Sequence, residues 1–242
     1  MIDTHCHIDL YPNPKEVADL SESLGIPTLV MTNLPSHFEI GHEHLLGYKK
    51  VRLALGMHPL YAQHHENEYP LFVKNINKTS YIGEVGLDFS FEGINTKATQ
   101  IEYFNRVLSA IGGEKKLISL HSRKAESEVL KCLKEQNSKL AIFHWYSGAL
   151  KLIDQIASDG YYFSINPAMV ASDSGRKIIK RIPADLILTE SDGPFTSWKG
   201  KPCLPSDVKL TYDYLSQIWS MSILEVESKI NENFKGIISQ LK

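Results

Sequence analysis

The chain has 242 residues, of which 43% are hydrophobic, so it is long enough to bury a large core. Its 26 basic and 28 acidic side chains nearly cancel, which argues against a general basic field that would hold the protein on nucleic acid. The three cysteines, Cys6, Cys132 and Cys203, form no C-x-x-C pair and do not suggest a disulfide framework. The first residues do not resemble a secretion signal, and no apolar run is long enough to span a bilayer. We therefore expect a cytoplasmic protein without membrane contacts.

Short apolar runs rich in β-branched and aromatic residues recur along the whole chain and predict strands. Between most of them, apolar residues follow helical spacing, so strands and helices alternate. The last helical pattern begins behind Ser222, with Glu225 three residues on, and predicts a long C-terminal helix that closes the fold. The predicted strands cover residues 2–8, 26–33, 51–58, 81–87, 117–122, 140–145, 161–166 and 185–191.

This alternation predicts an α/β fold of the (β/α)8 TIM-barrel type, because eight repeats in 242 residues match the usual size of such a barrel. Continuous apolar strands also indicate a parallel sheet that is covered by helices. A doubly wound open sheet is the structural alternative. No low-complexity tract, charge block or linker marks a boundary, so we expect one domain over residues 1–242.

Residue types that bind metals fall near the carboxyl ends of the predicted strands. His5 and His7 alternate along the first strand and therefore face one side, with Cys6 on the other. In a barrel this end carries the active site, because the loops of all repeats converge there. We therefore expect the candidate ligands to meet in space. They are His5, His7, Glu84, His121, His144 and Asp192.

Glu84 is the most informative of these residues. It lies between Gly83 and Gly86 in an otherwise apolar strand, where an unpaired carboxylate would be very costly to bury. A salt bridge to an inward Lys or Arg is the ordinary explanation, but the neighbouring strands offer no basic residue in their cores. A bound metal is the better interpretation.

The other candidates each have an ordinary explanation when taken alone. The His5-x-His7 pair can arise by chance, and His121 and His144 can be satisfied core histidines. Asp192 can initiate the turn at Gly193. Their repetition at equivalent strand ends favours a shared site. Mixed imidazole and carboxylate ligands suit a pair of divalent ions, and the ligand chemistry does not choose among Mg, Mn and Zn.

The candidate ligands lie in a series of short motifs spread over nearly the whole chain. They are Asp-Thr-His-Cys-His at 3–7, Gly-Met-His-Pro at 56–59, Gly-Glu-Val-Gly-Leu-Asp at 83–88, His-Ser-Arg at 121–123, His-Trp-Tyr-Ser-Gly at 144–148, Glu-Ser-Asp-Gly-Pro at 190–194 and Asn-Phe at 233–234. In these motifs and in their order, the chain resembles the TatD family of metal-dependent hydrolases, which belongs to the wider amidohydrolase-like barrel group.

The resemblance implies a role for each ligand. One metal would be held by His5, His7, Glu84 and Asp192, and the second by Glu84, His121 and His144. Glu84 would bridge the two ions, and Asp192 would also act as general base, so both are catalytic candidates. Family members are described as deoxyribonucleases, a chemistry for which two metals are well suited. His58 and Arg123 would then be candidate phosphate contacts, although either can have a purely structural role.

Several segments depart from the family, and they concern the substrate. Ser-Ile-Asn-Pro-Ala-Met at 164–169, in and after the seventh predicted strand, differs from the usual family segment. Residues 198–205 carry lysines where the family usually has an arginine. Trp145, Tyr146, Phe195 and Trp198 are aromatic residues expected near the mouth of the barrel. They can stack on unpaired bases while Lys199 and Lys201 contact the backbone, which is typical of single-strand binding. Packing of loops explains the same aromatic residues equally well.

Three functions remain open at this point. The first is a nuclease that cleaves DNA in single strands or at ends. The second is a hydrolase of a small amide, ester or phosphoester, because barrel function depends on loops. The third is a metal-binding subunit with little activity of its own. The short length and the segments Leu-Tyr-Pro-Asn-Pro at 10–14, Asn-Pro-Ala-Met at 166–169 and Asp-Gly-Pro-Phe at 192–195 also resemble a sub-branch encoded in Qat-type anti-phage defence operons. This resemblance implies partner proteins from such an operon.

Overall fold

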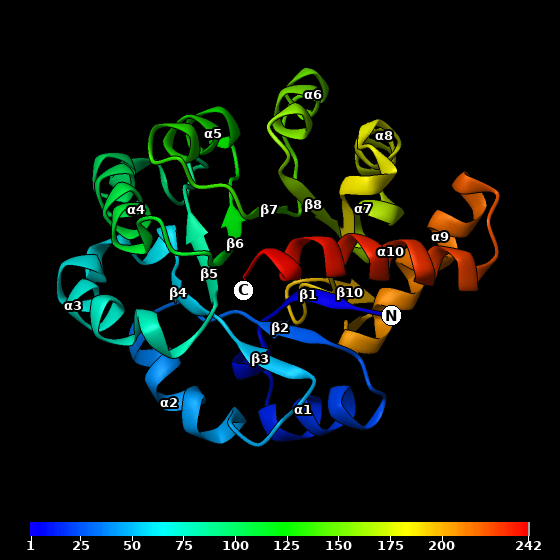
Figure 1. Ribbon diagram of the computed structural model, residues 1–242, viewed down its shortest axis with the longest axis horizontal. Helices are drawn as coiled ribbons and strands as arrows, with labels where there is room; N and C mark the ends of the chain where they lie inside the picture. The colour runs from blue at the N-terminus through cyan, green and yellow to red at the C-terminus, as the bar shows by residue number, and fades with distance from the viewer. Residues whose placement is uncertain (242) are drawn as a thin grey trace.

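Parallel strands surround the centre of the molecule and helices form a ring outside them (Figure 1). The computed structural model describes residues 1–241, and Lys242, the last residue of the predicted domain, lies outside the described residues. The strands of the ring are β1 (Asp3–Cys6), β2 (Thr28–Val30), β3 (Val51–Leu53), β4 (Leu55–Met57), β5 (Tyr81–Gly86), β6 (Leu117–His121), β7 (Ala141–His144), β8 (Tyr162–Ile165) and β9 (Ile187–Thr189).

The helices follow the strands in the alternation that the sequence predicts. They are α1 (Pro14–Ser23), α2 (Pro35–Leu45), α3 (His65–Asn75), α4 (Lys97–Ile111), α5 (Glu126–Glu135), α6 (Leu150–Ser158), α7 (Pro167–Ala171), α8 (Asp173–Arg181), α9 (Lys209–Trp219) and α10 (Ile223–Ile238). A short antiparallel hairpin, β10 (Ser197–Trp198) with β11 (Lys201–Pro202), follows β9. Among residues 1–241, no helix is both long and apolar enough to cross a membrane.

The strands form two parallel ladders that adjoin to make the barrel. One ladder runs β1-β2-β3 and the other β4-β5-β6-β7-β8-β9. The segment after β9 joins the first strand, because Asp192 N–H donates to the His5 carbonyl at 2.9 Å and His7 N–H donates to the Gly193 carbonyl at 2.8 Å. At the other boundary, Ala54 N–H donates to the Val30 carbonyl at 2.8 Å. The predicted (β/α)8 barrel is thus confirmed.

The strand predicted at residues 51–58 is wrong in one respect, because the structure divides it into β3 and β4. β3 pairs with β2, whereas β4 pairs with β5, so the chain changes its neighbour at Ala54. This change of partner ends one ladder and begins the next. Periodicity alone does not reveal it, because the apolar pattern continues through the bend.

A close backbone crossing at Gly56 places Glu84 in the barrel. Thr32 N–H donates to the Gly83 carbonyl and Glu84 N–H donates to the Thr32 carbonyl, both at 3.1 Å. A Cβ atom on Gly56 would lie 1.5 Å from the Thr32 carbonyl oxygen, so only glycine leaves room for the end of β2 to reach β5. The backbone of Glu84 is therefore fixed by a contact between segments that are distant in sequence.

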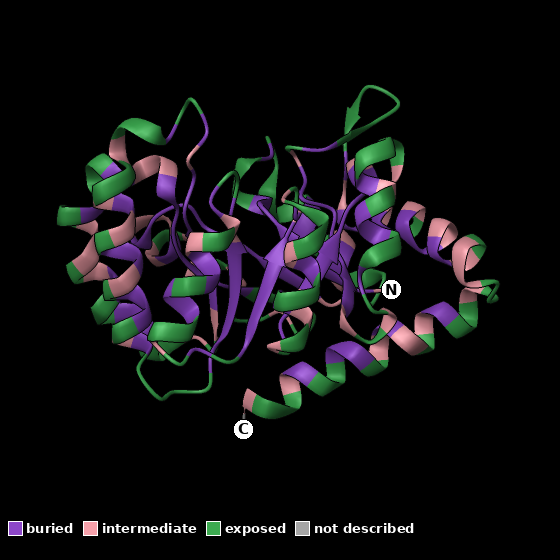
Figure 2. Cartoon of the chain, turned by 90° about the horizontal axis from the view of Figure 1, so that it is seen from above, coloured by how far each residue is buried: buried purple, intermediate pink, exposed green. Residues whose placement is uncertain are grey.

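The predicted C-terminal helix is α10, and it lies across the amino ends of the strands (Figure 1). Ser222 and Glu225 form both halves of a capping box at its start. Asn233 donates its amide to the carbonyls of Ala184 and Ile187, both at 2.8 Å, and thereby ties the helix to the start of β9. Figure 2 shows that the strands are buried and that the helices alternate between buried inner faces and exposed outer faces.

The Gly56 crossing generates a stability prediction. Gly56→Ala should lower the free energy of unfolding by more than about 3 kcal/mol, or prevent folding, because the added methyl group overlaps backbone. Gly47→Ala is the matched control, since a Cβ there meets nothing within 4 Å, and its effect should stay within about 1 kcal/mol. Urea unfolding followed by circular dichroism measures both variants. Equal urea midpoints for Gly56→Ala and Gly47→Ala would contradict the close approach of the two backbones at Gly56.

Candidate metal centre

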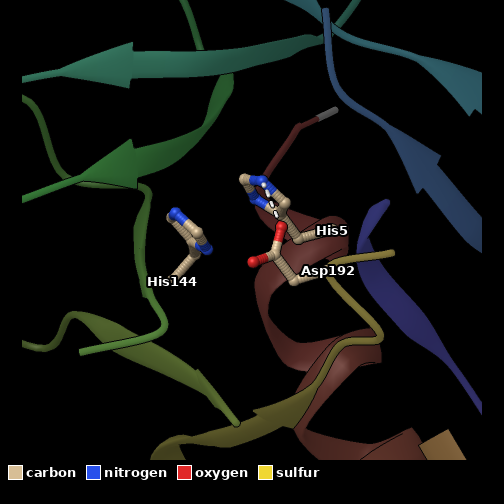
Figure 3. Close-up of side chains that lie close together, drawn as sticks. All are labelled: His5, His144 and Asp192. Atoms are coloured by element: carbon tan, nitrogen blue, oxygen red, sulfur yellow. Dashed lines mark ion pairs between the residues drawn. The ribbon is translucent and has the colours of Figure 1, made fainter. Parts of the chain in front are cut away.

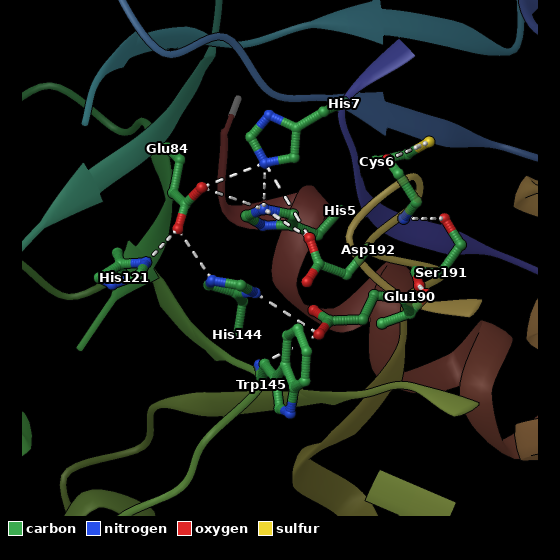
Figure 4. A network of polar contacts seen from close by, with 12 residues as sticks. His5, Cys6, His7, Glu84, His121, His144, Trp145, Glu190, Ser191 and Asp192 are labelled. Atoms are coloured by element: carbon green, nitrogen blue, oxygen red, sulfur yellow. Dashed lines mark hydrogen bonds and ion pairs between the residues drawn. The ribbon is translucent and has the colours of Figure 1, made fainter. Parts of the chain in front are cut away.

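Side chains from five strands or the turns directly after them converge inside the carboxyl end of the barrel (Figure 4). His5 lies on β1 and His7 directly after it, while Cys6 between them points away and packs in the hydrophobic core. The remaining members come from other strands, and all of these side chains are buried except that of His121, which is 15% exposed. They are Glu84 on β5, His121 on β6, His144 on β7 and Asp192 after β9.

The two oxygens of Glu84 face two different groups of imidazoles. Oε2 lies 3.1 Å from His7 Nε2 and 3.5 Å from His5 Nε2. Oε1 lies 2.6 Å from His121 Nδ1 and 2.9 Å from His144 Nε2. The carboxylate therefore stands between the two groups, as a bridging ligand must.

Asp192 completes the group around His5 and His7. Its Oδ1 lies 3.8 Å from His5 Nε2 and 4.0 Å from His7 Nε2, and these two nitrogens are 3.2 Å apart. The His5 ring also stacks on that of His144, with centroids 3.8 Å apart (Figure 3). Three sets of residues have the spacing of a metal site, because the ligand atoms within each set all lie within 4.8 Å of one another. The sets are His5, His144 and Asp192; His5, His7 and Glu84; and His58, Glu84 and His121.

The charge balance of this region fits divalent cations. Five carboxylates are buried here, and within residues 1–241 none of them pairs with a Lys or Arg. The salt-bridge explanation for Glu84 therefore fails. Burial of several carboxylates whose only possible positive partners are imidazoles is costly, and a cation would reduce that cost. The five are Asp3, Glu84, Asp88, Glu190 and Asp192.

The pKa values of the buried carboxylates and imidazoles reflect both burial and the charges of their neighbours. Burial opposes ionisation of Glu84, but the imidazoles of His58, His144 and His121 outweigh it and hold its pKa well below the usual range. Burial raises the pKa of Asp192 well above its usual range, since the positive charge near His144 does not compensate. The pKa of His144 is raised because Glu84 and Glu190 overcome the effect of burial. The pKa of His121 is raised as well, because Glu84 and Asp88 outweigh burial, so without cations these two imidazoles favour the protonated form and metal binding there would release protons.

Asp88 orients His121, a role that the sequence reasoning did not assign. Its Oδ2 lies 2.7 Å from His121 Nε2, while His121 Nδ1 faces Glu84. Burial opposes ionisation of Asp88, but hydrogen bonds from His121 and Ser90 outweigh it and lower its pKa to about 2. An ionised carboxylate behind the ring fixes the ring orientation and increases the basicity of the nitrogen that faces the site. The position of Asp88 at the end of the 83–88 motif was the available signal.

Glu190 is a second acidic residue that the sequence reasoning missed. Its Oε1 accepts the Trp145 backbone N–H at 3.1 Å and the Asn166 amide at 2.9 Å, and Ser164 donates to Oε2. His144 Nδ1 lies 3.5 Å from Oε1, an ion-pair distance rather than that of a short hydrogen bond. Glu190 therefore holds the end of β7, on which His144 lies, against β8.

Asp3 has an equivalent role on the other side of the site. Its carboxylate accepts the Ser191 backbone N–H at 2.9 Å, the Ser191 hydroxyl at 2.6 Å and the His5 N–H at 3.2 Å. Burial raises the pKa of this carboxyl to about 8. The contact ties the start of β1 to the segment that carries Asp192. The sequence signal for this role was that Asp3 is the first residue of the 3–7 motif.

The four expected substrate contacts lie in different positions relative to the candidate metal ligands. His58 belongs to the site, since its Nε2 lies 3.4 Å from Glu84 Oε1. Trp145 adjoins the site through Glu190, and its ring packs partly against the core. Arg123 is half exposed and pairs with Glu92 at 3.7 Å. Lys199 is exposed in the turn between β10 and β11 and touches none of the ligands in the described part of the chain.

The expectation that Tyr146 lies at the mouth of the barrel is wrong. Its side chain is 1% exposed, packs edge-on against Phe163 and donates its hydroxyl to the Ala149 carbonyl at 2.8 Å. The ring lies edge-on to Phe143 as well, and the residue before it, Trp145, has a positive φ of 36°. Aromatic character alone cannot distinguish this packing position from a stacking position.

The contact of Asp88 with His121 leads to a prediction about metal affinity. Asp88→Asn should weaken divalent-metal binding about 10- to 100-fold, because the amide no longer provides a negative acceptor for His121. Glu92→Gln on the same loop removes the same charge, but Glu92 is exposed and contacts no candidate ligand, so its affinity should match that of the wild type. Isothermal titration with Mn²⁺ measures both variants. An equal loss of Mn²⁺ affinity in Asp88→Asn and Glu92→Gln would show that the net charge of the loop matters, rather than the orientation of the His121 ring.

Comparison with known proteins places this geometry in a family. The family model described as "TatD related DNase" matches residues 2–239. An uncharacterized metal-dependent hydrolase of Methanocaldococcus jannaschii is 28% identical, with 96% of this chain and 94% of that protein covered. The human protein named deoxyribonuclease TATDN3 is 23% identical, with 100% of this chain and 96% of that protein covered.

Solved structures show the same fold. The TatD homologue YjjV of Escherichia coli superposes with a TM-score of 0.87 at 21% identity, covering 100% of this chain and 97% of that chain. A TatD-family hydrolase of Entamoeba histolytica gives a TM-score of 0.80 at 19% identity, covering 98% and 97%. With its family model matched over almost its whole length, the chain belongs to the TatD-related DNase family and is a metal-dependent hydrolase.

Proposed function

We propose that this hydrolase is a deoxyribonuclease that cleaves phosphodiester bonds of DNA with the help of two divalent ions. The observation that carries the proposal is the arrangement of Glu84, whose two oxygens face separate imidazole groups. One ion would be held by His5, His7, Glu84 and Asp192, and the other by Glu84, His121 and His144. Membership of the family and the name of the human relative support DNA as the substrate.

The protein groups would divide the reaction between them. When bound, the ions, which we expect to be Mg, Mn or Zn, would supply Lewis acidity and lower the pKa of a water molecule. Asp192 accepts the proton of the attacking water, because its carboxylate lies at the edge of the His5 and His7 group. Glu84 holds the two halves of the site at a fixed separation. The attack forms a new P–O bond and breaks the ester bond to the leaving strand.

The rim of the site favours single strands or ends as substrates. Phe195 is 59% exposed and lies edge-on to His7, with centroids 5.1 Å apart. Trp198 is 42% exposed on the β10–β11 hairpin, whose turn residues Lys199 and Gly200 both have positive φ. An exposed aromatic ring beside a lysine is suited to an unpaired base and its phosphate. Arg123, Trp145 and Lys199 remain proposed substrate contacts on this basis.

Partner proteins from an anti-phage operon stay a prediction. The relatives of M. jannaschii and human described above are named as a metal-dependent hydrolase and a deoxyribonuclease, and these names do not refer to defence. The proposed nuclease activity does not depend on such partners.

The test of the proposal is cleavage of end-labelled single- and double-stranded DNA in the presence of Mg²⁺, Mn²⁺ or Zn²⁺. Wild type should cleave only with metal, and His5→Ala/His7→Ala should lose at least about 10³-fold in rate, since both imidazoles lie at the site. The control is His44→Ala/His64→Ala, which removes two exposed histidines. If metal-loaded wild type cleaves neither DNA form, a small-molecule substrate becomes the better hypothesis.

A second measurement counts the ions. Glu84→Gln should lose both ions, because one carboxylate faces both groups, whereas His144→Gln should lose only one. Elemental analysis of dialysed protein reports the number of bound ions per chain. Retention of one tight ion by Glu84→Gln would show that the two groups are independent.

A further inference from the structure

The loop between β5 and α4, residues 87–96, carries the most exposed large apolar side chain of the described residues. Phe91 is 88% exposed, and within residues 1–241 its ring contacts no other aromatic ring. Single exposed apolar side chains are common on protein surfaces and by themselves indicate no function. The surroundings of Phe91 therefore have to show whether its ring has a role.

The backbone of this loop is held by buried polar side chains. Asp88 accepts the Ser90 backbone N–H at 2.8 Å, and Gln100 accepts the Asp88 backbone N–H at 2.8 Å. The same Gln100 amide donates to the Gly93 carbonyl at 2.7 Å. A Cβ atom on Gly93 would lie 2.2 Å from the Asp88 carbonyl oxygen, so the loop closes tightly on itself. Phe91 therefore projects from a fixed turn, and little backbone freedom would be lost when a ligand binds its ring.

The loop lies beside the His121 half of the candidate metal centre. Asp88, three residues before Phe91, has its other carboxylate oxygen 2.7 Å from His121 Nε2. The Phe89 backbone N–H donates to the Arg123 carbonyl at 3.0 Å, which ties the loop to the turn after β6. Phe91 thus belongs to the same end of the barrel as the metal ligands.

The exposed rings of Phe195 and Trp198 follow β9, which lies opposite β5 in the barrel. In one direction β6, β7 and β8 stand between them. In the other direction stand β1, β2 and the consecutive strands β3 and β4, which share one position. The Phe195 ring lies edge-on to His7, with centroids 5.1 Å apart, and Figure 4 shows His7 and His121 on opposite sides of the Glu84 carboxylate. Phe91 and Phe195 therefore flank the two halves of the centre.

Basic side chains lie on the same side of the mouth as Phe91. Arg123 Nη1 lies 3.7 Å from a carboxylate oxygen of Glu92, and Lys97 Nζ lies 4.3 Å from the centroid of the Phe89 ring. Arg123 and Glu92 are both about half exposed, so their ion pair is weak and a phosphate group can replace Glu92. An aromatic ring near a cation is the combination that binds an unpaired base together with its phosphate.

We propose that Phe91 is a second stacking platform, which holds a base of a single DNA strand on the far side of the cleaved bond from Phe195 and Trp198. The inference rests on the proposed DNA hydrolysis and names a substrate-binding residue for it. A strand that stacks on rings at both sides passes over the candidate metal centre, so the substrate extends to both sides of the cleaved bond. Every base has an aromatic face, so this platform selects unpaired DNA without selecting a base sequence.

The first test measures binding of a fluorescent single strand of deoxythymidylate, whose phosphorothioate linkages resist cleavage, with Mn²⁺ present. Phe91→Ala should weaken binding about 5- to 150-fold, the range for loss of one base–aromatic stack. Phe91→Trp should bind as wild type does, whereas Phe91→Leu, which is apolar but not aromatic, should not. The matched control is Leu224→Ala, which removes another exposed apolar side chain at the start of α10 and should leave affinity unchanged. Equal affinity of Phe91→Ala and wild type would overturn the proposal.

Abasic nucleotides, which keep the sugar and phosphate but have no base, locate the stack relative to the cleaved bond. On one side of that bond they should lower the kcat/KM of wild type and have no further effect on Phe91→Ala. On the other side they should have no further effect on Phe195→Ala. If abasic nucleotides lower kcat/KM by the same factor in wild type and Phe91→Ala at every position, Phe91 holds no base and the proposal fails.

The outcomes distinguish this inference from the proposed function. If wild type cleaves DNA and Phe91→Ala binds and cleaves it equally well, only the second platform fails. If metal-loaded wild type cleaves no DNA, the proposed function fails, and this inference fails with it. Wild-type cleavage together with loss in Phe91→Ala and recovery in Phe91→Trp supports both.

Discussion

The position of one buried carboxylate, Glu84, is the constraint on which the rest of the site depends. Its charge is held in an apolar barrel by imidazoles from three other strands and from the segments after β1 and β4. Neither the carboxylate nor the imidazoles would be stable there alone, because each would be a buried polar group without a partner. Within residues 1–241 no lysine or arginine pairs with Glu84, and the surrounding imidazoles and carboxylates form a set of donors that fits a divalent cation.

Backbone hydrogen bonds fix the position from which the Glu84 side chain enters the barrel. The crossing of β2 over Gly56 gives Thr32 access to Gly83 and Glu84, and the same region holds His58 through Asn33. On the opposite side, Asp3 ties β1 to the segment with Asp192. The barrel therefore serves as a rigid frame in which the distances between ligands are set by strand pairing. Rigid placement of this kind is what preorganised electrostatic catalysis requires.

A second layer of acidic side chains gives each imidazole a direction. Asp88 Oδ2 lies 2.7 Å from His121 Nε2, and Glu190 Oε1 lies 3.5 Å from His144 Nδ1, whereas the Leu60 backbone N–H donates to His58 Nδ1. Residues of one type at similar strand ends thus acquire different chemistry from the atoms behind them.

The sequence by itself determined the barrel and the set of polar residues at the carboxyl ends of its strands. Strand and helix periodicity is local, and the residues that bind metals break the apolar pattern visibly, so both could be recognised along the chain. It did not reveal that residues 51–58 divide into β3 and β4, that Tyr146 turns into the core, or that Asp88 and Glu190 support the ligands. These features depend on which segments lie side by side in space. Only the tertiary structure decided them, because pairing partners and hydrogen-bond donors come from residues far apart in the chain.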